Sequence, residues 1–580
     1  MTQPPPPPPN QPPQPPNQPP QAPPPGYGYP PPAPPQPPAQ PGYGYPQPPV
    51  QPGYGYPGAQ QNPYAQQPTH PGYGYPGRPG HPGQPATVPM QPQQGKGGGR
   101  NNTALFIVVA AVVAIALIIG GGVWYARSSG DDGKKHDTAS SGGGTGGKNG
   151  ADTSGGSSGG GGKEKVPADT ASKVLFQVPM PRTDDTIGTT GSWLTDTVYA
   201  KSGIAEIVGY DPAKGTERWT LKLPGPVCAA SSHVTSAGLT AITFQPKMPT
   251  KDKTAGCSEV AAIDLTAGKK LWSKSIKTGD FPITFQNVTV AQHTVAVGSS
   301  DGGAAFDIGS GKVLWQPKPD DTCYDAGYGG GTRLVAVRKC GAYDNRQLHI
   351  QTIDPKTGKV ISEYKMPDGV EYASVVSTDP LVIAADVGHS AGDGSGVSDY
   401  FSLDGRTGRL LARISAPGDT YSGHCDGITR IEGCRQIAAG HGRLYLATEV
   451  HDGSGQYNKT NEIVSFDLNT GKPARGRAEA GDGYTLSPLR MDGGNLLAYM
   501  APPWNKGGQV VSIDGDSLRT TKLLENPGNR SVHQGESGLL PEYAEILFGK
   551  GRLYMSAVFV HKTNPAYGKE YLLMAFGTDG

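Results

Sequence analysis

The residues of this 580-residue chain that most directly predict chemistry are its six cysteines, which all lie beyond residue 227. An even number of cysteines, with no C-x-x-C pair and no histidine at metal-ligand spacing, favours disulfides over a zinc site. We predict sequential pairing, in which each disulfide closes one local loop; buried free thiols in a reducing compartment are the alternative. The predicted pairs are Cys228 with Cys257, Cys323 with Cys340, and Cys425 with Cys434.

Two further patterns resemble catalytic or metal sites but lack the context that such sites need. Residues 388–392 match G-x-S-x-G, yet a nucleophile elbow needs a following helix to place Ser390, and a Gly-rich run follows instead. Asp386, Asp393 and Asp399 offer oxygen ligands for Ca²⁺, but their spacing fits no defined calcium loop. The sequence therefore predicts no catalytic residue and no metal site.

Four aromatic residues are predicted to act as anchors for a binding partner. Trp504 lies in a Gly/Pro-rich loop, and Tyr324, Tyr328 and Tyr421 lie near the predicted disulfide loops. Aromatic side chains on loops bury a large apolar area when a partner covers them, so they commonly dominate binding energy. The alternative is that each ring packs locally against its own loop.

The elements that position these residues follow a repeat. Its frame is an Asp, a Gly four residues later and a Trp four residues after that, flanked by short apolar segments. The three full copies are Asp211/Gly215/Trp219, Asp264/Gly268/Trp272 and Asp307/Gly311/Trp315, and looser copies begin at Asp354, Asp404, Asp467 and Asp514. The intervals of 43 to 63 residues, made of short strand patterns without a helical run, are typical of propeller blades. The repeated residues are therefore predicted to build blades rather than a site.

The two ends of the repeat region predict how the ring closes. Residues 173–177 match the segment after the turn of the third copy, 312–316, but no Asp turn precedes them. Residues 571–576 match the segment before a turn. We expect the first segment to supply the outer strand of the last blade, which removes the open edges of the sheet. Seven full copies and one split copy predict an all-β, eight-bladed β-propeller, with seven blades as the alternative.

The motifs at 262–272 and 307–315 resemble the PQQ-type propeller repeat, which occurs in quinoprotein alcohol dehydrogenases and in non-enzymatic outer-membrane assembly lipoproteins. The resemblance covers 171–580, and the whole layout is similar to actinobacterial membrane-anchored PQQ-like repeat proteins. For the dehydrogenases it implies a vicinal Cys–Cys disulfide against the quinone and a bound calcium ion. This chain has no adjacent cysteines, so we predict that it binds no cofactor.

The N-terminal region predicts a membrane anchor. Residues 1–100 contain no acidic residue and four Pro-Gly-Tyr-Gly-Tyr-Pro copies, a composition typical of a disordered tail. Residues 103–126 hold an uncharged apolar run long enough to span a bilayer as an uncleaved signal anchor, and 127–170 read as a Gly/Ser-rich linker. Since every cysteine follows the span, we expect a cytoplasmic N-terminus and an extracellular C-terminal domain.

The formal net charge of +1 disfavours nucleic-acid binding. Our functional hypothesis is a membrane-tethered, non-catalytic binding or scaffold module that contacts an envelope protein or a small ligand through a propeller face. The alternatives are a quinoprotein oxidoreductase that uses PQQ and a ligand sensor coupled to the cytoplasmic tail. The oligomeric state is not predicted.

Overall fold

The computed structural model describes residues 164–250, 254–318, 321–342, 346–388, 390–391, 396–425, 430–564 and 568–578. The predicted tail at 1–100, the predicted membrane span at 103–126 and most of the linker lie outside the described residues. No helix in the described part of the chain is long and apolar enough to cross a membrane.

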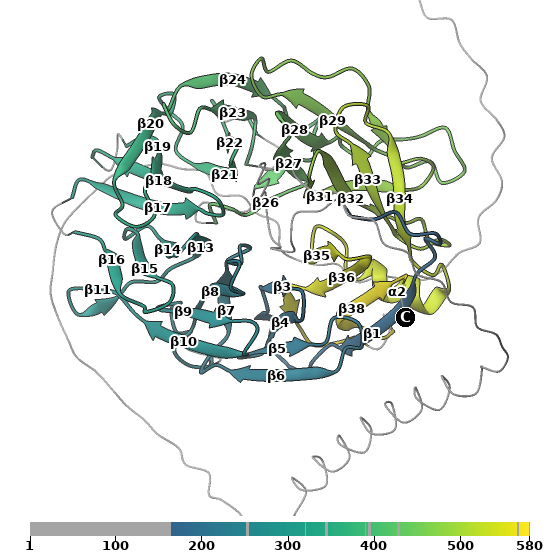
Figure 1. Ribbon diagram of the computed structural model, residues 1–580, viewed down its shortest axis with the longest axis horizontal. Helices are drawn as coiled ribbons and strands as arrows, with labels where there is room; N and C mark the ends of the chain where they lie inside the picture. Colours follow the sequence, from purple (N-terminus) through teal and green to yellow (C-terminus); the bar gives the residue numbers. More distant parts are fainter. Residues whose placement is uncertain are drawn as a thin grey trace, which may run out of the picture. The chain divides into compact units, whose positions relative to one another are not determined.

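Eight four-stranded antiparallel sheets are arranged in a ring, and the strands of each sheet run from the centre of the ring outward (Figure 1). We number the sheets as blades 1 to 8 and call their strands A to D from the inside outward. The prediction of an eight-bladed propeller is confirmed.

The blades follow one another along the chain. Blade 1 contains β3 (Ser192–Leu194), β4 (Tyr199–Gly203), β5 (Glu206–Tyr210) and β6 (Glu217–Lys222); blade 2 contains β7 (Val227–Ala230), β8 (Leu239–Phe244), β9 (Glu259–Asp264) and β10 (Lys269–Lys274). Blade 3 contains β13 (Asn287–Ala291), β14 (Thr294–Gly298), β15 (Ala304–Asp307) and β16 (Val313–Trp315); blade 4 contains β17 (Cys323–Gly329), β18 (Leu334–Cys340), β19 (Gln347–Ile353) and β20 (Val360–Lys365).

The second half of the ring has the same order. Blade 5 contains β21 (Ala373–Thr378), β22 (Leu381–Ala385), β23 (Asp399–Leu403) and β24 (Leu410–Ser415); blade 6 contains β27 (Ile437–Gly440), β28 (Arg443–Ala447), β29 (Glu462–Asp467) and β30 (Ala478–Glu479). Blade 7 contains β31 (Thr485–Asp492), β32 (Asn495–Ala501), β33 (Gln509–Asp514) and β34 (Thr520–Glu525); blade 8 contains β35 (Ala544–Gly549), β36 (Arg552–Ala557), β38 (Tyr571–Gly577) and β1 (Lys173–Pro179).

Blade 8 closes the ring in the way that the sequence predicts. Its outer strand β1 comes from the start of the propeller and pairs antiparallel with β38, with Val174 opposite Phe576 and Gln177 opposite Met574. The segment before β1 is also tied to blade 7, because the Ser172 N–H donates to the Glu525 carbonyl at 2.8 Å. The first described residues therefore join blades 7 and 8.

The Asp turns between strands C and D have the geometry that their residues dictate. In blade 3, Asp307 Oδ1 accepts the Ser310 N–H at 2.8 Å, and Gly311 ends the turn at φ 69°. The corresponding glycines of the other Gly-containing copies have φ between 65° and 72°, a region that glycine enters without steric cost. In blade 7, Leu518 takes this place at φ 55° with a buried side chain.

At the boundaries between the first blades, an aromatic ring of one blade packs against the turn glycine of the next blade. A Cβ on Gly268 would lie 2.3 Å from the ring of Trp219, and one on Gly311 would lie 2.7 Å from the ring of Trp272. The Trp272 Nε1–H also donates to the Ile308 carbonyl in that turn at 2.8 Å. The glycines are therefore required twice, for their positive φ and for the absence of a side chain.

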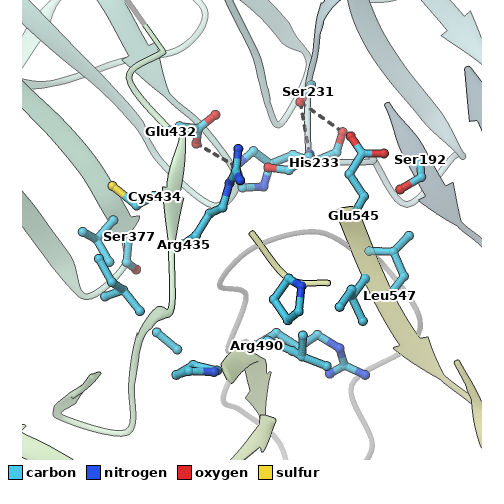
Figure 2. A pocket seen from close by; sticks show the side chains of 18 of the residues that line it. Ser192, Ser231, His233, Ser377, Glu432, Cys434, Arg435, Arg490, Glu545 and Leu547 are labelled. Atoms are coloured by element: carbon cyan, nitrogen blue, oxygen red, sulfur yellow. Dashed lines mark hydrogen bonds and ion pairs between the residues drawn. The ribbon is translucent and has the colours of Figure 1, made fainter. Parts of the chain in front are cut away.

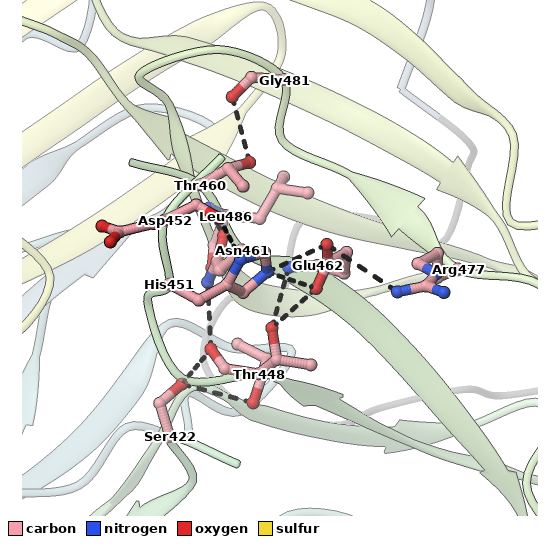
Figure 3. A network of polar contacts seen from close by, with 11 residues as sticks. Ser422, Thr448, His451, Asp452, Thr460, Asn461, Glu462, Arg477, Gly481 and Leu486 are labelled. Carbon is pink, nitrogen blue, oxygen red and sulfur yellow. Dashed lines mark hydrogen bonds and ion pairs between the residues drawn. The ribbon is translucent and has the colours of Figure 1, made fainter. Parts of the chain in front are cut away.

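Polar side chains also connect neighbouring blades near the channel. In Figure 3, Asn461 of blade 6 reaches Leu486 of blade 7, where its Oδ1 accepts the Leu486 N–H at 2.6 Å. Equivalent bonds run from the Val290 N–H to Ser231 Oγ, from the Tyr328 N–H to Asn287 Oδ1, and from the Gly191 N–H to Glu545 Oε1. Inner-strand amides that face the channel thus find acceptors on the preceding blade.

The links between blades add a few elements. In the part of the chain that the structure describes, the helix α2 (Arg530–Ser537) lies between blades 7 and 8, and Asn529 caps it by accepting the Val532 N–H. This helix follows the last Asp turn, so the intervals between the Asp turns contain only strands and connections among the described residues, as expected. Three two-stranded sheets pair β2 (Ile187–Gly188) with β37 (Phe559–Val560), β11 (Lys277–Thr278) with β12 (Phe281–Pro282), and β25 (His424–Cys425) with β26 (Cys434–Arg435).

The blade boundary generates a first prediction. Gly268→Ala places a methyl group against Trp219, whereas Gly279→Ala meets no atom within 4 Å although Gly279 also has a positive φ of 60°. Left-handed backbone strain costs both variants about 1 kcal/mol, and overpacking costs Gly268→Ala roughly 1 to 3 kcal/mol more. We expect a clearly larger fall in the midpoint of thermal unfolding for Gly268→Ala. Equal falls would contradict the role given to the Trp219 contact.

Candidate functional site

The two faces of the propeller differ in what they carry. Because strands alternate in direction within each blade, the A–B and C–D turns lie at one end of the ring and the B–C and D–A connections lie at the other. We call the first end the turn face and the second end the loop face. The seven Asp turns belong to the turn face, and the long, non-repeating connections belong to the loop face.

The three disulfides lie on the loop face. They join the cysteines in the sequential order expected: Cys228 to Cys257, Cys323 to Cys340 and Cys425 to Cys434. Cys228–Cys257 ties the start of strand A in blade 2 to the B–C connection of that blade, and Cys323–Cys340 joins the first residue of strand A to the last residue of strand B in blade 4. The third disulfide closes a loop in the link between blades 5 and 6. Covalent bonds thus restrain the face whose sequence does not repeat.

The exposed aromatic side chains gather on the same face. Among the described residues, every exposed aromatic ring belongs to a B–C or D–A connection: Phe281 (78% exposed), Trp504 (73%), Tyr543 (67%), Phe559 (48%) and Tyr372 (41%). Exposed aromatic side chains offer large apolar areas that a binding partner can bury. The loop face is therefore the candidate binding surface.

Trp504 is exposed on a loop that its neighbours hold in place. Asn505 Oδ1 accepts the Tyr457 hydroxyl at 2.6 Å, and the Lys506 ammonium lies 5.7 Å from the Tyr457 ring centroid. On the other side, His533 Nδ1 of α2 lies 3.0 Å from the Lys506 carbonyl oxygen. A partner that covers this indole gains its apolar area with little loss of loop entropy.

The B–C connection of blade 6, which contains Tyr457, is itself held by polar contacts to that blade. Figure 3 shows His451, Thr448 and Glu462, which make these contacts. His451 Nε2 lies 3.1 Å from both carboxylate oxygens of Glu462, and the Thr448 hydroxyl donates to Glu462 Oε2 at 3.1 Å. The Asp452 carbonyl and the Glu462 carboxylate raise the pKa of His451. The B–C connections of blades 6 and 7 thus form one braced unit around Trp504.

Tyr328 is a correction to the sequence-based prediction. Its side chain is fully buried on β17, where the hydroxyl donates to Asp325 Oδ2 at 2.5 Å and accepts the Trp315 Nε1–H at 3.0 Å. Burial raises the pKa of this hydroxyl well above its usual value. Tyr328 therefore belongs to the blade core and cannot serve as a surface anchor.

Tyr324 and Tyr421 are half-buried and pack locally. The Arg346 guanidinium lies 4.8 Å from the Tyr324 ring centroid and donates to its hydroxyl at 3.0 Å. The Tyr421 ring meets Phe466 edge to face at 5.7 Å. Both rings thus lie on the loop face, where each packs against its own surroundings, as the alternative interpretation expected.

The sequence-based prediction of anchors did not include four aromatic side chains that are exposed on the loop face: Phe281, Tyr372, Tyr543 and Phe559. Phe281 follows Gly279-Asp280 and Tyr543 follows Pro541-Glu542, which is the same turn-forming context that identified Trp504.

The centre of the ring is partly filled by the loop that the third disulfide closes, which we call the channel loop (425–434; Cys425 and 430–434 described). Figure 1 shows β26 inside the ring. Glu432 Oε1 lies 2.8 Å from His233 Nε2 of blade 2 and accepts the Gly330 N–H of blade 4 at 2.7 Å (Figure 2). The Ile431 carbonyl accepts the Val375 N–H of blade 5 at 2.7 Å. One loop therefore crosslinks three blades from inside.

The ion pair of the channel loop shifts both of its partners. Burial alone would lower the pKa of His233, but the negative charge of Glu432 outweighs it and the pKa is raised. Burial alone would raise the pKa of Glu432, but the His233 charge outweighs it and the pKa is lowered. Both shifts favour the charged pair.

Beside the channel loop a cavity of about 350 Å³ runs along the inner strands. Its charged groups are engaged with other groups of the protein. The Glu545 carboxylate contacts the fully buried Lys201 ammonium at 2.9 Å, and Arg435 Nη1 donates to the Glu542 carbonyl. Burial lowers the pKa of Lys201, which Glu545 partly opposes. The pair joins blade 8 to blade 1 and thus also supports ring closure.

These features define a PQQ-like repeat propeller, and the comparisons with known proteins agree. A protein family described as outer membrane protein assembly factor BamB has a sequence model that matches residues 256–525, a little under half of the chain. This match confirms the repeat recognised in the sequence. No curated protein matches the chain.

Solved structures share the fold at low similarity. BamB from Moraxella catarrhalis is 12% identical, with 70% of this chain and 100% of that chain covered at a TM-score of 0.34. The quinohemoprotein alcohol dehydrogenase ADHIIG from Pseudomonas putida HK5 is 12% identical, and the match covers 72% of this chain and 77% of that chain at a TM-score of 0.41. The dihydro-heme d1 dehydrogenase NirN is 13% identical, and the match covers 63% of this chain and 75% of that chain at a TM-score of 0.37. Such scores do not distinguish a binding protein from an enzyme.

The channel residues do not fit the quinone and calcium ion that the dehydrogenases of this fold hold. The channel loop occupies the centre, and its disulfide joins strands β25 and β26 rather than adjacent cysteines. The carboxylates of Glu432 and Glu545 are each paired with a cation and a backbone N–H. Within the described ranges no three His, Cys, Asp or Glu side chains form a group that could hold a metal ion.

The His233–Glu432 pair generates a second prediction. Since folding raises the pKa of His233, the folded state binds this proton more tightly than the unfolded state. The stabilisation that this proton gives the folded state is complete below the ordinary histidine pKa of about 6.5. It is lost as the pH rises through the pKa that His233 has in the folded protein. At pH 6 we expect the wild-type protein to have a higher midpoint of thermal unfolding than His233→Gln. The difference between the two midpoints should become smaller as the pH is raised to 9. A gap that stays constant from pH 6 to 9 would contradict the ion pair.

Proposed function

We propose that this chain is a membrane-tethered propeller that binds a protein partner in the cell envelope through its loop face and has no catalytic role. The observation that carries the proposal is the gathering of all described exposed aromatic rings on that face, with Trp504 on a braced loop. Rigid, exposed aromatic side chains are the residues that most often dominate protein–protein binding.

The distribution of the rings favours a macromolecule over a small ligand. They extend from the link between blades 2 and 3 (Phe281) to the B–C connection of blade 8 (Phe559). A small ligand would be covered by one pocket, whereas a protein interface buries about 800 Å² on each partner and contacts several loops at once.

Two further observations support the location. The three disulfides persist only where the environment is oxidising, which favours the exported side of a membrane. The apolar run at 103–126 supplies the anchor that this placement requires. The matched family is described as an assembly factor, and we carry over from that description only a role in binding.

A quinoprotein oxidoreductase is the rival activity, and the paired charges of the channel argue against it. Incubation of the full-length protein with PQQ and Ca²⁺, followed by an assay of dye-linked alcohol oxidation, separates the two functions. The proposal expects no turnover above the protein-free control, and measurable turnover would overturn it.

Trp504 gives the third prediction. Chemical crosslinking in intact cells, followed by purification of the full-length chain, should recover a partner with wild type. Trp504→Ala should reduce that recovery by about tenfold or more, since hot-spot aromatics contribute at least about 2 kcal/mol. The matched control is Val166→Ala, which truncates an exposed aliphatic side chain that belongs to none of the loop-face connections.

Both side chains are exposed, so neither variant should lower the thermal midpoint by more than a degree or two. Undiminished recovery with Trp504→Ala, or equal loss with both variants, would count against the loop face as the binding surface.

A further inference from the structure

The turn face carries a ring of cations that the repeat places at equivalent positions. Five residues after the turn Asp, blades 2 to 7 each have a Lys or Arg: Lys269, Lys312, Lys359, Arg409, Lys472 and Arg519. All six side chains are exposed, and none forms an ion pair with another described residue. The ring therefore presents unpaired positive charge from six successive blades.

The acidic residues of the same turns are less available. Asp307 Oδ1 accepts both the N–H and the hydroxyl of Ser310, at 2.8 and 2.6 Å. Asp354 does the same with Thr357, at 2.8 and 2.7 Å. These hydrogen bonds lower the pKa of both carboxyls and direct the charge into the turn. The cations form no ion pair with a described residue, although Arg409 and Arg519 lie close enough to Asp404 and Asp514 to help lower the pKa of those carboxyls.

In blades 2 to 4, exposed aliphatic side chains lie one or two residues after these cations. We call this segment the basic rim: Lys269, Leu271 (41% exposed), Lys312, Val313 (38%), Lys359, Val360 (52%) and Ile361 (56%). Elsewhere among the described residues, exposed large aliphatic side chains are single: Val166, Met248 and Val450. Cations interleaved with aliphatic groups are the composition of surfaces that rest on anionic membranes, where headgroups attract the charge and the interface accepts the apolar groups.

The chain enters the propeller at this same face. The Glu164 carboxylate accepts the backbone N–H groups of Lys550 and Gly551 at 3.1 and 3.3 Å, and the Glu164 N–H donates to Asp492 Oδ2 at 2.6 Å. These partners lie at the A–B turns of blades 7 and 8. Glu164, the first described residue, therefore lies at the turn face. In the sequence, only 37 residues separate it from the apolar run that ends at residue 126.

We propose that the basic rim lies against the anionic phospholipid headgroups of the membrane to which the chain is tethered. This arrangement directs the loop face, with Trp504, away from the bilayer and towards a partner. The inference rests on the proposed membrane tether. A Gly/Ser-rich stretch of 37 residues has a root-mean-square reach of roughly 30 to 35 Å, so it holds the rim close enough to the membrane for weak multivalent contacts to operate.

The test uses the full-length protein reconstituted in vesicles of phosphatidylcholine, with or without phosphatidylglycerol, that contain nitroxide-labelled lipid. A fluorescent non-canonical amino acid replaces Val313 on the rim or, in a second preparation, Met248 on the loop face of blade 2. We expect lipid quenching at position 313 to exceed that at 248 at least twofold in anionic vesicles. The excess should disappear in phosphatidylcholine alone and at high salt.

Charge reversal supplies matched variants. Lys269→Glu/Lys312→Glu/Lys359→Glu reverses three rim charges, and Lys247→Glu/Lys277→Glu/Lys318→Glu reverses three exposed charges in the loop-face connections of blades 2 and 3. Each lysine near an anionic surface changes the equilibrium about fivefold, so the rim variant should lose the excess quenching while the loop-face variant keeps it.

The outcomes separate the two proposals. Equal quenching at 313 and 248 in anionic vesicles, or equal loss in both charge variants, would overturn the docking of the rim while leaving the tether intact. Failure of the full-length protein to float with vesicles of either composition would overturn the membrane tether itself, and the rim proposal with it.

Discussion

The ring depends on contacts between the outer strand of one blade and the turn glycine of the next, where a side chain cannot be accommodated. Phe176 of the closing strand lies on Gly215, and Trp219, Trp272 and Trp315 lie on the glycines of blades 2, 3 and 4. Further round, backbone atoms take the place of the ring, as where the Glu363 carbonyl lies against Gly408. Because β1 supplies both the last strand of blade 8 and the ring on Gly215, the closure of the propeller and its first boundary depend on the same segment. This packing requirement is why a glycine recurs in the turn from blade to blade.

The architecture could be predicted from the sequence because it is repeated. Asp, Gly and Trp keep their spacing, so the number of blades, the split blade and the local disulfide loops follow from the order of the copies. Individual side chains could not be placed in the same way. Tyr328 reads as a loop residue near Cys323, yet it is the sixth residue of the continuous strand β17 and its side chain is fully buried. The helix α2 has only eight residues and depends on burial of Glu536 among Tyr499, Asn526 and Gly508, partners that sequence periodicity does not reveal.

The two faces of the propeller differ in sequence and in the side chains that they expose. The turn face is made of repeated residues, carries the cations that follow each Asp turn, and receives the incoming chain at Glu164. The loop face is made of non-repeating connections, which three disulfides and the channel loop restrain, and it exposes the aromatic rings. The channel loop also explains why the centre is unsuited to a flat cofactor: its Glu432 is used to connect blades 2 and 4. Function on this scaffold is therefore expected where the sequence varies from blade to blade.

The central claim is that the loop face makes the contact with the partner. Site-specific photocrosslinking in intact cells tests it most directly, with a photoreactive amino acid placed in turn at positions 281, 504 and 543 of the loop face and at 472 and 519 of the turn face. The account predicts adducts of one defined protein from two or more of the loop-face positions and from neither turn-face position. Adducts of that protein from the turn face, or no protein adduct from any loop-face position, would contradict it.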